Sequence, residues 1–419
     1  MSPWRDFADP HPSDARGDRR TEGRALRADV PFDVALRVAV GSAEKARLAT
    51  WLEGGGPVAA LPASDLARAV AEAPRSGIAV VCGTAQIAEP AVVGVVAHRV
   101  AGSATKPGRL LDVVDPDAAL PGPWEFDLLG LALEAVLSSR PSRRRAAVLA
   151  VGSSYRDAIE SLARRPLHAR MSAARARAAS LATGSPSSAF SPEHAVDELV
   201  RDGRLRAKRV ARRWGSTQVR RAGADVEIEL AQYRESLPDP DASLLSGYRV
   251  ADAVEDEQGR LLVLLARAGR SPDEVLLEGL PAQPSPLEDA FGVWRHGSDV
   301  HRVLAMRGIV PLVPADFPGW STRRDGSVTR AWWRARSTAA APSTHRAPSR
   351  DSRPKARGSG GRSPGSGHSA RQDDFVRRAA LLGLVHGRTG DASLLAGYLG
   401  GSPRFPRALA ESVLAVATA

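Results

Sequence analysis

Apolar positions in the first half of the chain follow two different periods. Runs in which most residues are apolar, as covered strands require, occupy 77–83 and 110–114. Apolar residues at helical spacing predict helices over four further ranges, 43–52, 64–73, 126–138 and 143–163. The helix that begins near 126 carries one apolar stripe, Phe126, Leu129, Leu133, Val136 and Leu137, which we interpret as core. This mixture predicts an α/β or α+β block.

The second half of the chain has a different order of elements. Two runs, 248–254 and 260–265, predict a hairpin, followed by a strand at 274–277 and a helix at 299–307. Helical spacing returns at 375–385 and 407–416, on either side of a Gly-Gly-Ser-Pro break. Strands should therefore outweigh helices in the middle of the chain, and helices should form its end.

Composition divides these elements into five segments. Segments rich in Ser, Pro, Gly and Arg predict flexible chain, and the ordered blocks lie between them. The predicted organisation is a disordered tail at 1–27, an α/β block at 28–181, a strand-rich block at 182–336, a flexible basic linker at 337–372 and a helical cap at 373–419.

Positive charge is concentrated in two places. The chain has 419 residues and a formal net charge of +11, but 337–372 alone holds seven Lys or Arg residues against one acid. A second cluster of nine basic residues against one acid contains Arg201, Arg204, Arg206, Lys208, Arg209, Arg212, Arg213, Arg220 and Arg221. With Trp214 among them, these residues could bind nucleic acid. A solvated helix face or a mobile arm is the alternative that we favour.

The remaining composition argues against several classes of protein. Cys82 is the only cysteine, which excludes an internal disulfide and a multi-Cys metal site and is compatible with a reducing compartment. We interpret Cys82 as a buried structural thiol. The N-terminal residues are polar and charged, so we expect no signal peptide, no membrane helix and a cytoplasmic location.

Several short motifs occur in the order typical of one bacterial family. They are Gly-Arg-Ala-Leu-Arg (23–27), Leu-Asp-Val-Val-Asp-Pro-Asp (111–117), Leu-Pro-Gly-Pro-Trp-Glu-Phe-Asp (120–127), Tyr-Arg-Glu-Ser-Leu-Pro (233–238), 244–254, 283–288, His-Gly-Arg-Thr-Gly-Asp (386–391) and Ala-Gly-Tyr-Leu-Gly (396–400). Over nearly its whole length the chain resembles the uncharacterised bacterial domain-of-unknown-function family 2252. We expect its relatives to continue beyond Ala419, which would leave the cap incomplete.

This resemblance implies an α+β fold of the protein-kinase-like or aminoglycoside-phosphotransferase-like, two-lobed kind, with a C-terminal helical cap. The family's motifs look like a kinase catalytic loop and metal-binding Asp, a Gly-rich loop and a phosphate-binding Lys. In kinases these groups position the hydroxyl, hold Mg²⁺ and steady the phosphates of ATP. The motif order is rearranged, because in this family the Gly-rich stretch and the Lys follow the catalytic loop.

The residues at the catalytic-loop positions of this chain are unsuited to that chemistry. Thr84 stands where the family has its candidate base, Gln86 replaces a His and Glu89 replaces an Asn. A Thr hydroxyl is not a base near neutral pH, so proton abstraction is lost. Glu89 could still hold a metal ion.

The phosphate-binding positions have changed as well. The Gly-rich stretch corresponds to Glu-Asp-Glu-Gln-Gly at 255–259, whose carboxylates would repel a nucleotide. Leu280 takes the place of the Lys, and no lysine lies between Lys208 and Lys355. Neither position is expected to hold a phosphate.

Two motif regions retain polar side chains whose role stays open. Asp112, Asp115 and Asp117 are either a remnant metal-binding cluster or acids that cap a turn, and we favour the turn. His386 either lines a cleft or is stabilised by the dipole of a helix C-terminus, and we favour the dipole.

Three hypotheses follow. The first is a catalytically silent, kinase-like protein that binds an unknown protein partner and needs no cofactor. The second is a divergent phosphotransferase that uses Mg²⁺ and ATP, with Glu89, Asp112 and Asp115 on the metal. The third is a protein that binds nucleic acid through the basic cluster in 201–221 and the basic linker.

Overall fold

The computed structural model describes most of the chain, with gaps. The described residues are 16–37, 75–82, 91–93, 110–113, 116–166, 169–170, 172–174, 176–177, 192–223, 225–267, 273–281, 283–285, 287–291, 299–311, 315–322, 328–335 and 366–418. The fold is a mixed α+β fold, as expected. The predicted helices 43–52 and 64–73, and the predicted linker up to residue 365, lie outside the described residues.

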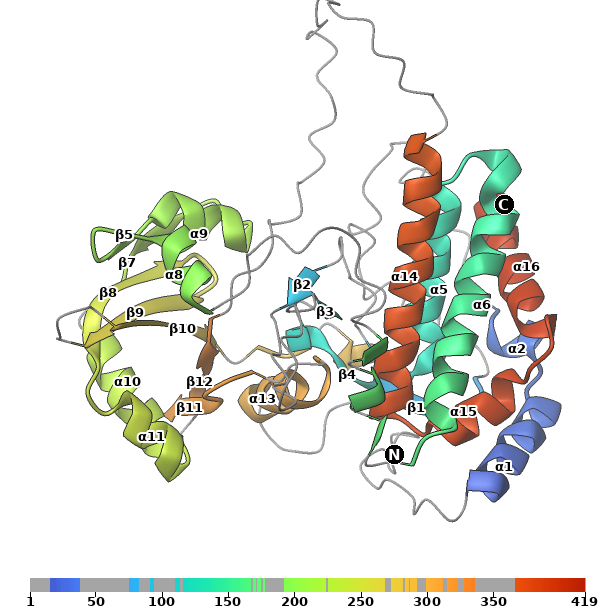
Figure 1. Ribbon diagram of the computed structural model, residues 1–419, viewed down its shortest axis with the longest axis horizontal. Coiled ribbons are helices and arrows are strands. Elements are labelled where there is room, and N and C mark those ends of the chain that lie inside the picture. Colours follow the sequence, from blue (N-terminus) through green and yellow to red (C-terminus); the bar gives the residue numbers. More distant parts are fainter. Residues whose placement is uncertain are drawn as a thin grey trace, which may run out of the picture.

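Long helices form one part of the molecule, the helical body, on the right of Figure 1. It contains α1 (Arg16–Asp29), α2 (Phe32–Ala35), α5 (Trp124–Leu137), α6 (Arg144–Ala163), α14 (Ser366–Thr389), α15 (Ala392–Leu399) and α16 (Arg404–Thr418). One apolar core joins the faces of α5, α6, α14, α15 and α16. Gly383 lets α14 approach α6, because a Cβ there would lie 2.7 Å from the carbonyl oxygen of Tyr155.

The sequence correctly predicted α5 and α6, but the two ends of the chain differ from expectation. Residues 16–29, assigned to a disordered tail, form α1, which lies against α15. The C-terminal helices do not form a separate cap, since Leu382, Leu395 and Leu409 share the core of α5 and α6. Both ends therefore belong to the helical body.

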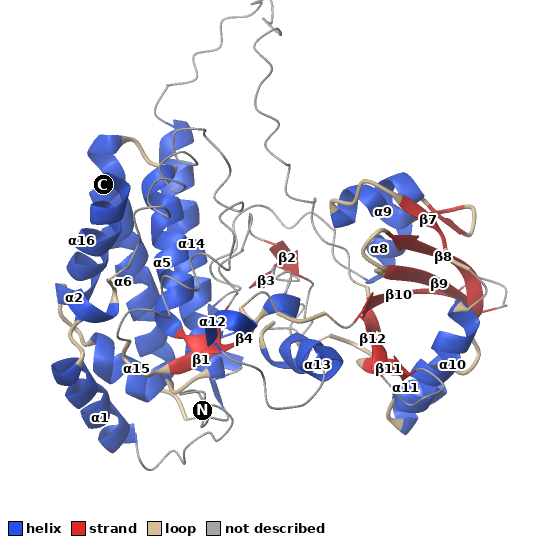
Figure 2. Ribbon diagram, turned by 180° about the vertical axis from the view of Figure 1, so that it is seen from behind, coloured by secondary structure: helices blue, strands red, loops and turns tan. Residues whose placement is uncertain are grey.

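A six-stranded antiparallel sheet forms the other part of the molecule, as Figure 2 shows in red. Its spatial order is β11 (Gly319–Thr322), β12 (Val328–Arg334), β10 (Asp273–Pro281), β9 (Leu261–Arg267), β8 (Arg249–Asp256) and β7 (Val219–Arg221). The hairpin predicted at 248–265 is β8–β9, which pairs from Arg249 opposite Ala266 to Glu255 opposite Leu261, with a register shift between Val250 and Asp252. The predicted strand at 274–277 is part of the longer β10.

Helices cover both faces of this sheet (Figures 1 and 2). On one face Leu262, Leu264 and Leu276 contact α8 (Pro192–Leu199) and α9 (Ala207–Trp214). On the other, alternate residues of the same strands contact α10 (Val226–Ser236) and α11 (Asp239–Leu245). A short hairpin, β5 (Val200–Arg201) with β6 (Arg204–Leu205), joins α8 to α9. These four helices were not predicted.

Short elements lie between the helical body and the sheet. They are β1 (Ala79–Cys82), β2 (Ala91–Val93), β3 (Leu110–Asp112), the 3-10 turn η3 (Pro116–Ala118), β4 (Leu120–Pro123), α12 (Glu288–Phe291) and α13 (Asp299–Ile309). Another 3-10 turn, η4 (Pro141–Arg143), joins α5 to α6 within the helical body. Met306 and Val310 pack with Val385 of α14, so the region of α13 contacts the helical body. Within the described parts of the chain, no helix has the length and apolar character that crossing a membrane requires.

Candidate functional site

Thr84, Gln86 and Glu89, the positions that the sequence analysis compared with a catalytic loop, lie outside the described residues, as does Asp115. Asp112 is the last residue of β3 and stands opposite Ala91 of β2. Among the described residues, no three His, Cys, Asp or Glu side chains come together as a metal site would require. The structure therefore places only Asp117 of the three predicted aspartates in side-chain detail.

Asp117 lies in an ion pair with α13. Nε of Arg307 donates to Oδ1 of Asp117 at 2.5 Å, and a second nitrogen of the same guanidinium donates to Oδ2. The Arg307 guanidinium also lies 4.5 Å from the ring centroid of Trp333. A two-pronged Arg–carboxylate contact of this kind fixes orientation as well as charge. Both oxygens of Asp117 are thus engaged in joining η3 to α13.

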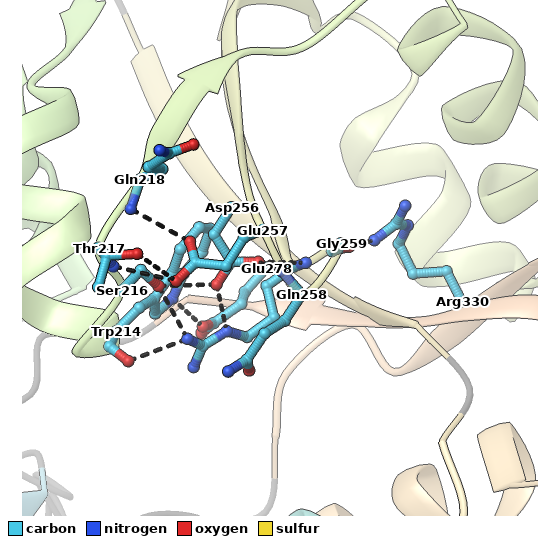
Figure 3. Close-up of polar contacts among 11 residues, drawn as sticks. Trp214, Ser216, Thr217, Gln218, Asp256, Glu257, Gln258, Gly259, Glu278 and Arg330 are labelled. Carbon is cyan, nitrogen blue, oxygen red and sulfur yellow. Dashed lines mark hydrogen bonds and ion pairs between the residues drawn. The ribbon is translucent and has the colours of Figure 1, made fainter.

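The acidic turn at 255–259 connects β8 to β9 and is closed by Asp256 (Figure 3). The buried carboxylate of Asp256 accepts from the backbone nitrogens of Gln258 at 3.0 Å and Arg260 at 2.8 Å. It also accepts from Nε of Arg260 and from the hydroxyl of Ser216, and Gly259 N donates to the Asp256 carbonyl. Three backbone N–H groups of the turn are therefore already satisfied from within the turn.

Glu257, although exposed, is also bound to the chain. Its carboxylate accepts from the backbone nitrogens of Thr217 at 3.0 Å and Gln218 at 3.2 Å, and from the Thr217 hydroxyl at 3.1 Å. These hydrogen bonds, above all the one from Thr217 N, lower the pKa of Glu257 to about 2. The carboxylate thus attaches the turn to the segment between α9 and β7.

The end of α9 is anchored to the sheet beside the turn. Nε1 of Trp214 donates to Oε1 of Glu278 at 2.8 Å, and Arg213 lies 3.4 Å from Oε2. The guanidinium of Arg260 lies over the Trp214 ring and donates to the Trp214 carbonyl at 2.9 Å. Burial would raise the pKa of Glu278, but the charges of Arg213 and Arg307 and the Trp214 hydrogen bond outweigh it and hold the pKa below its ordinary value.

Leu280 is part of an apolar cluster. It stands opposite Ala331 in the pairing of β10 with β12. Its side chain packs against a cluster formed by Val300 and Val303 of α13 together with Trp333 of β12. Position 280 therefore serves to join α13 to the sheet.

A second polar group, inside the helical body, was not recognised as a unit from the sequence. Nε2 of His386 lies 3.1 Å from Oδ2 of Asp127, and Nδ1 lies 2.9 Å from the Tyr155 hydroxyl. All three side chains are buried, and Trp124 stacks on Tyr155 at 5.9 Å between ring centroids. His386 is in the last turn of α14, as expected, but the contacts that hold it are these hydrogen bonds and not the helix dipole alone.

Glu125 extends this buried group toward the start of β1. Its Oε1 accepts from Ser76 N at 3.0 Å and from the Ser76 hydroxyl at 2.7 Å. The same hydroxyl accepts from Nε1 of Trp124. Burial raises the pKa of Glu125. The only signal in the sequence was a pair of acids, Glu125 and Asp127, on an otherwise apolar helix.

Comparison with known proteins gives one positive result. Residues 102–328, more than half of the chain, match the family described as an uncharacterized protein conserved in bacteria (DUF2252). No curated protein and no solved structure matches the chain. The matched range includes η3, α5 and the whole of the sheet up to the start of β12, so the motifs described above lie mostly within it. The chain belongs to this bacterial family, domain of unknown function 2252.

Proposed function

We propose that this chain is a kinase-like family member that has lost catalysis and acts as an interaction or regulatory protein by binding a partner. The order of elements supports the kinase-like part of this proposal. In kinases a Gly-rich loop covers the phosphates, a following strand carries the Lys and a helix pairs with that Lys. Here the 255–259 turn is followed by β10 with Leu280 and then by α13.

The main observation that supports the loss of catalysis is that the chain's own side chains fill one face of the sheet. Successive side chains of a strand point to opposite faces, so Leu276, Glu278 and Leu280 share a face of β10. Leu276 packs in the cluster of α8 and α9, Glu278 is bound by Trp214, and Leu280 contacts the cluster of α13. The chain's own side chains thus occupy the surface where a lysine at position 280 would meet a phosphate.

The acidic turn supports the same conclusion. Phosphate binding by a loop requires backbone N–H groups directed at the ligand. In this turn the N–H groups of Gln258, Gly259 and Arg260 donate to Asp256 instead. The ionised carboxylate of Glu257 adds a negative charge that repels phosphate oxygens.

Calorimetric titration of the purified chain with ATP, with and without Mg²⁺, tests this proposal. ATP concentrations should extend above about 1 mM, the upper end of ordinary enzyme KM values. The expected result is no binding heat in either condition. Magnesium-dependent binding that weakens in the Asp115→Asn variant would contradict the proposal and favour a divergent phosphotransferase that holds Mg²⁺ through Glu89, Asp112 and Asp115.

A further inference from the structure

Seven of the nine basic residues in 201–221 fall into two groups; of the other two, Arg201 pairs with Asp202 at 3.6 Å and Arg206 is half-buried. Arg213, Arg220 and Arg221 are engaged with acids of the sheet: Arg213 with Glu278 at 3.4 Å, and the other two with Glu255 and Asp252. These three guanidinium groups serve the attachment of α9 and β7 to the sheet.

Four other cations remain exposed. They are Arg204 on β6 and Lys208, Arg209 and Arg212 on α9, here named the basic ridge. None of the four makes an ion pair with another residue in the part of the chain that the structure describes. At 100° per residue, the three α9 positions fall within about 100° of the helix circumference. The basic ridge is thus one face of α9 together with Arg204 of the hairpin that precedes the helix.

The basic ridge stands on a fixed support. Val210, on the opposite side of α9, is buried in the apolar cluster over the sheet. Trp214 attaches the end of the helix, and Gly215 stops it in the left-handed conformation at φ +65°. Leu205 N of the hairpin donates to Asp252 at 2.7 Å. The four charges are therefore presented by ordered backbone, which reduces the entropy lost on binding.

The side chains around the basic ridge limit the classes of partner that it could bind. The large apolar side chains that are exposed in the described structure are Ile228, Leu244 and Ile309, none of which lies in 192–221. Protein interfaces and membrane-surface helices need apolar or aromatic side chains at the contact. Single strands need exposed aromatic rings for stacking, and Trp214 is engaged with Glu278 and Arg260. The class of partner that these observations leave is a nucleic acid contacted through its phosphate backbone, without stacking on its bases.

We propose that the basic ridge binds the phosphate backbone of double-stranded DNA, without sequence preference. The ridge is a helix face, and the major groove of B-form DNA admits an α-helix, whereas that of A-form RNA is too deep and narrow. Arginine guanidinium groups also match phosphate oxygens in pairs. The basic ridge is on the side of α9 that is turned away from the sheet face containing Leu280, so the inference holds whether or not ATP binds.

Fluorescence anisotropy with a labelled 20-base-pair duplex, over a series of salt concentrations, tests the inference. If the four cations contact phosphates, the logarithm of the association constant should fall with the logarithm of salt with a slope of about −3.6. Affinity should therefore fall about 10²-fold between 50 and 200 mM salt. Full-length protein is used, so that the basic segment 337–372 is present throughout.

Two variants of equal charge change make the test specific to α9. The triple variant Lys208→Gln, Arg209→Gln, Arg212→Gln should weaken duplex binding at least tenfold at low salt and make the slope less steep by about 3. The matched control Arg140→Gln, Arg143→Gln, Arg145→Gln removes three exposed cations from the helical body and should bind as the unchanged protein does.

Three results would overturn the inference. One is no duplex binding at 50 mM salt, and another is equal loss in the two variants, which would assign binding to overall charge. The third is tighter binding of a single strand, an RNA duplex or polyglutamate of the same length than of the DNA duplex. Circular dichroism of both variants confirms that a loss of binding does not come from unfolding.

Discussion

At the scale of single residues, the Asp127–His386–Tyr155 group illustrates how a buried polar side chain depends on its partners. All three side chains are buried, so they are out of contact with bulk water. Each group therefore contributes to stability mainly by satisfying the next, and removal of one leaves the full desolvation cost of its neighbour. The network ties α5, α6 and α14 together at one point of the core.

The Tyr155→Phe substitution tests this dependence. It removes only the hydroxyl oxygen and leaves Nδ1 of His386 without its partner, so the free energy of unfolding should fall by about 1–3 kcal/mol. Urea denaturation followed by circular dichroism measures the change. Ser172→Ala, which removes an exposed hydroxyl that bonds to Ala169, should change stability by less than about 0.5 kcal/mol. Equal effects of the two substitutions would show that burial of the network does not matter.

Glu257 should make stability depend on pH in a defined direction. Its folded-state pKa of about 2 lies below the ordinary value of 4.5, so its contribution is fully present above pH 4.5 and is lost as pH falls toward 2. The Glu257→Gln variant should therefore melt at a lower temperature than the unchanged protein at pH 6. This difference should shrink as pH is lowered from 4.5 toward 2, which thermal denaturation at successive pH values measures.

A Glu257 that titrated with an ordinary pKa would give another pattern. The two proteins would then keep the same difference in melting temperature throughout the acid range. Glu235→Gln is the matched control, because Glu235 is an acid of the same unit whose side chain makes none of the hydrogen bonds given above.

The helix that begins near Trp124 marks the limit of what single residues reveal in the sequence. Its stripe of Phe126, Leu129, Leu133, Val136 and Leu137 was predicted as core; the first four are buried and Leu137 is half-buried. The roles of Glu125 and Asp127 could not be predicted, because their partners lie 49 residues away at Ser76 and 259 residues away at His386. Periodicity reports which face is buried, whereas a buried acid is explained only by the distant group that bonds to it.

At the scale of elements, α1 was missed because its sequence is polar. Its attachment uses few side chains: Arg19 pairs with Asp391 at 2.7 Å, Arg27 donates to the Tyr398 carbonyl at 2.9 Å, and Gly23 allows close approach. A Cβ at Gly23 would lie 2.1 Å from the Leu394 carbonyl oxygen. Close backbone contact, which hydropathy does not register, thus takes the place of an apolar stripe.

The Gly23→Ala substitution should displace α1 from α15. Because the clash is with backbone, which cannot move aside, we expect a loss of about 1–3 kcal/mol and faster tryptic cleavage at the arginines of α1. Gly17→Ala in the same helix is the matched control, since nothing lies within 4 Å of its added Cβ. If Gly23→Ala were cleaved at the same rate as Gly17→Ala, close packing of α1 on α15 at Gly23 would be contradicted.

On β10, we expect that a lysine at position 280 does not create an ATP-binding site. Leu280→Lys supplies the ammonium group, but α9 and α13 still fill the face on which it stands. We expect a loss of about 1–3 kcal/mol in stability and no magnesium-dependent ATP binding by calorimetry. Leu280→Met, which conserves volume, should cost less than about 1.5 kcal/mol. ATP binding by the lysine variant would mean that the face is open to ligands.

At the scale of the whole molecule, the sequence predicted which segments are helices and strands better than it predicted which of them pack together. The β8–β9 hairpin and the helices α5, α6, α13, α14 and α16 follow from local patterns, so they were found. The six-stranded order was not found, because β11 and β12 join the sheet beside β10 after α13 intervenes in the chain. The segment 337–372 suggested a separate cap, yet α14 lies beside α6, two hundred residues earlier in the chain.

The last prediction concerns this long-range core. A chain that ends at residue 336 would lack α14, α15 and α16, and with them Leu382, Leu395 and Leu409 of the shared core. It would also leave Asp127 and Tyr155 without His386. If the C-terminal helices formed a separate cap, their removal would not affect the rest of the chain. If they share the core of α5 and α6, the helical body of the truncated chain should not fold. Thermal denaturation should therefore show the loss of the helical transition, while a separately supplied segment 366–419 should restore part of it. A truncated chain that melts as the full one does would mean that α5 and α6 need no partner from the C-terminal helices.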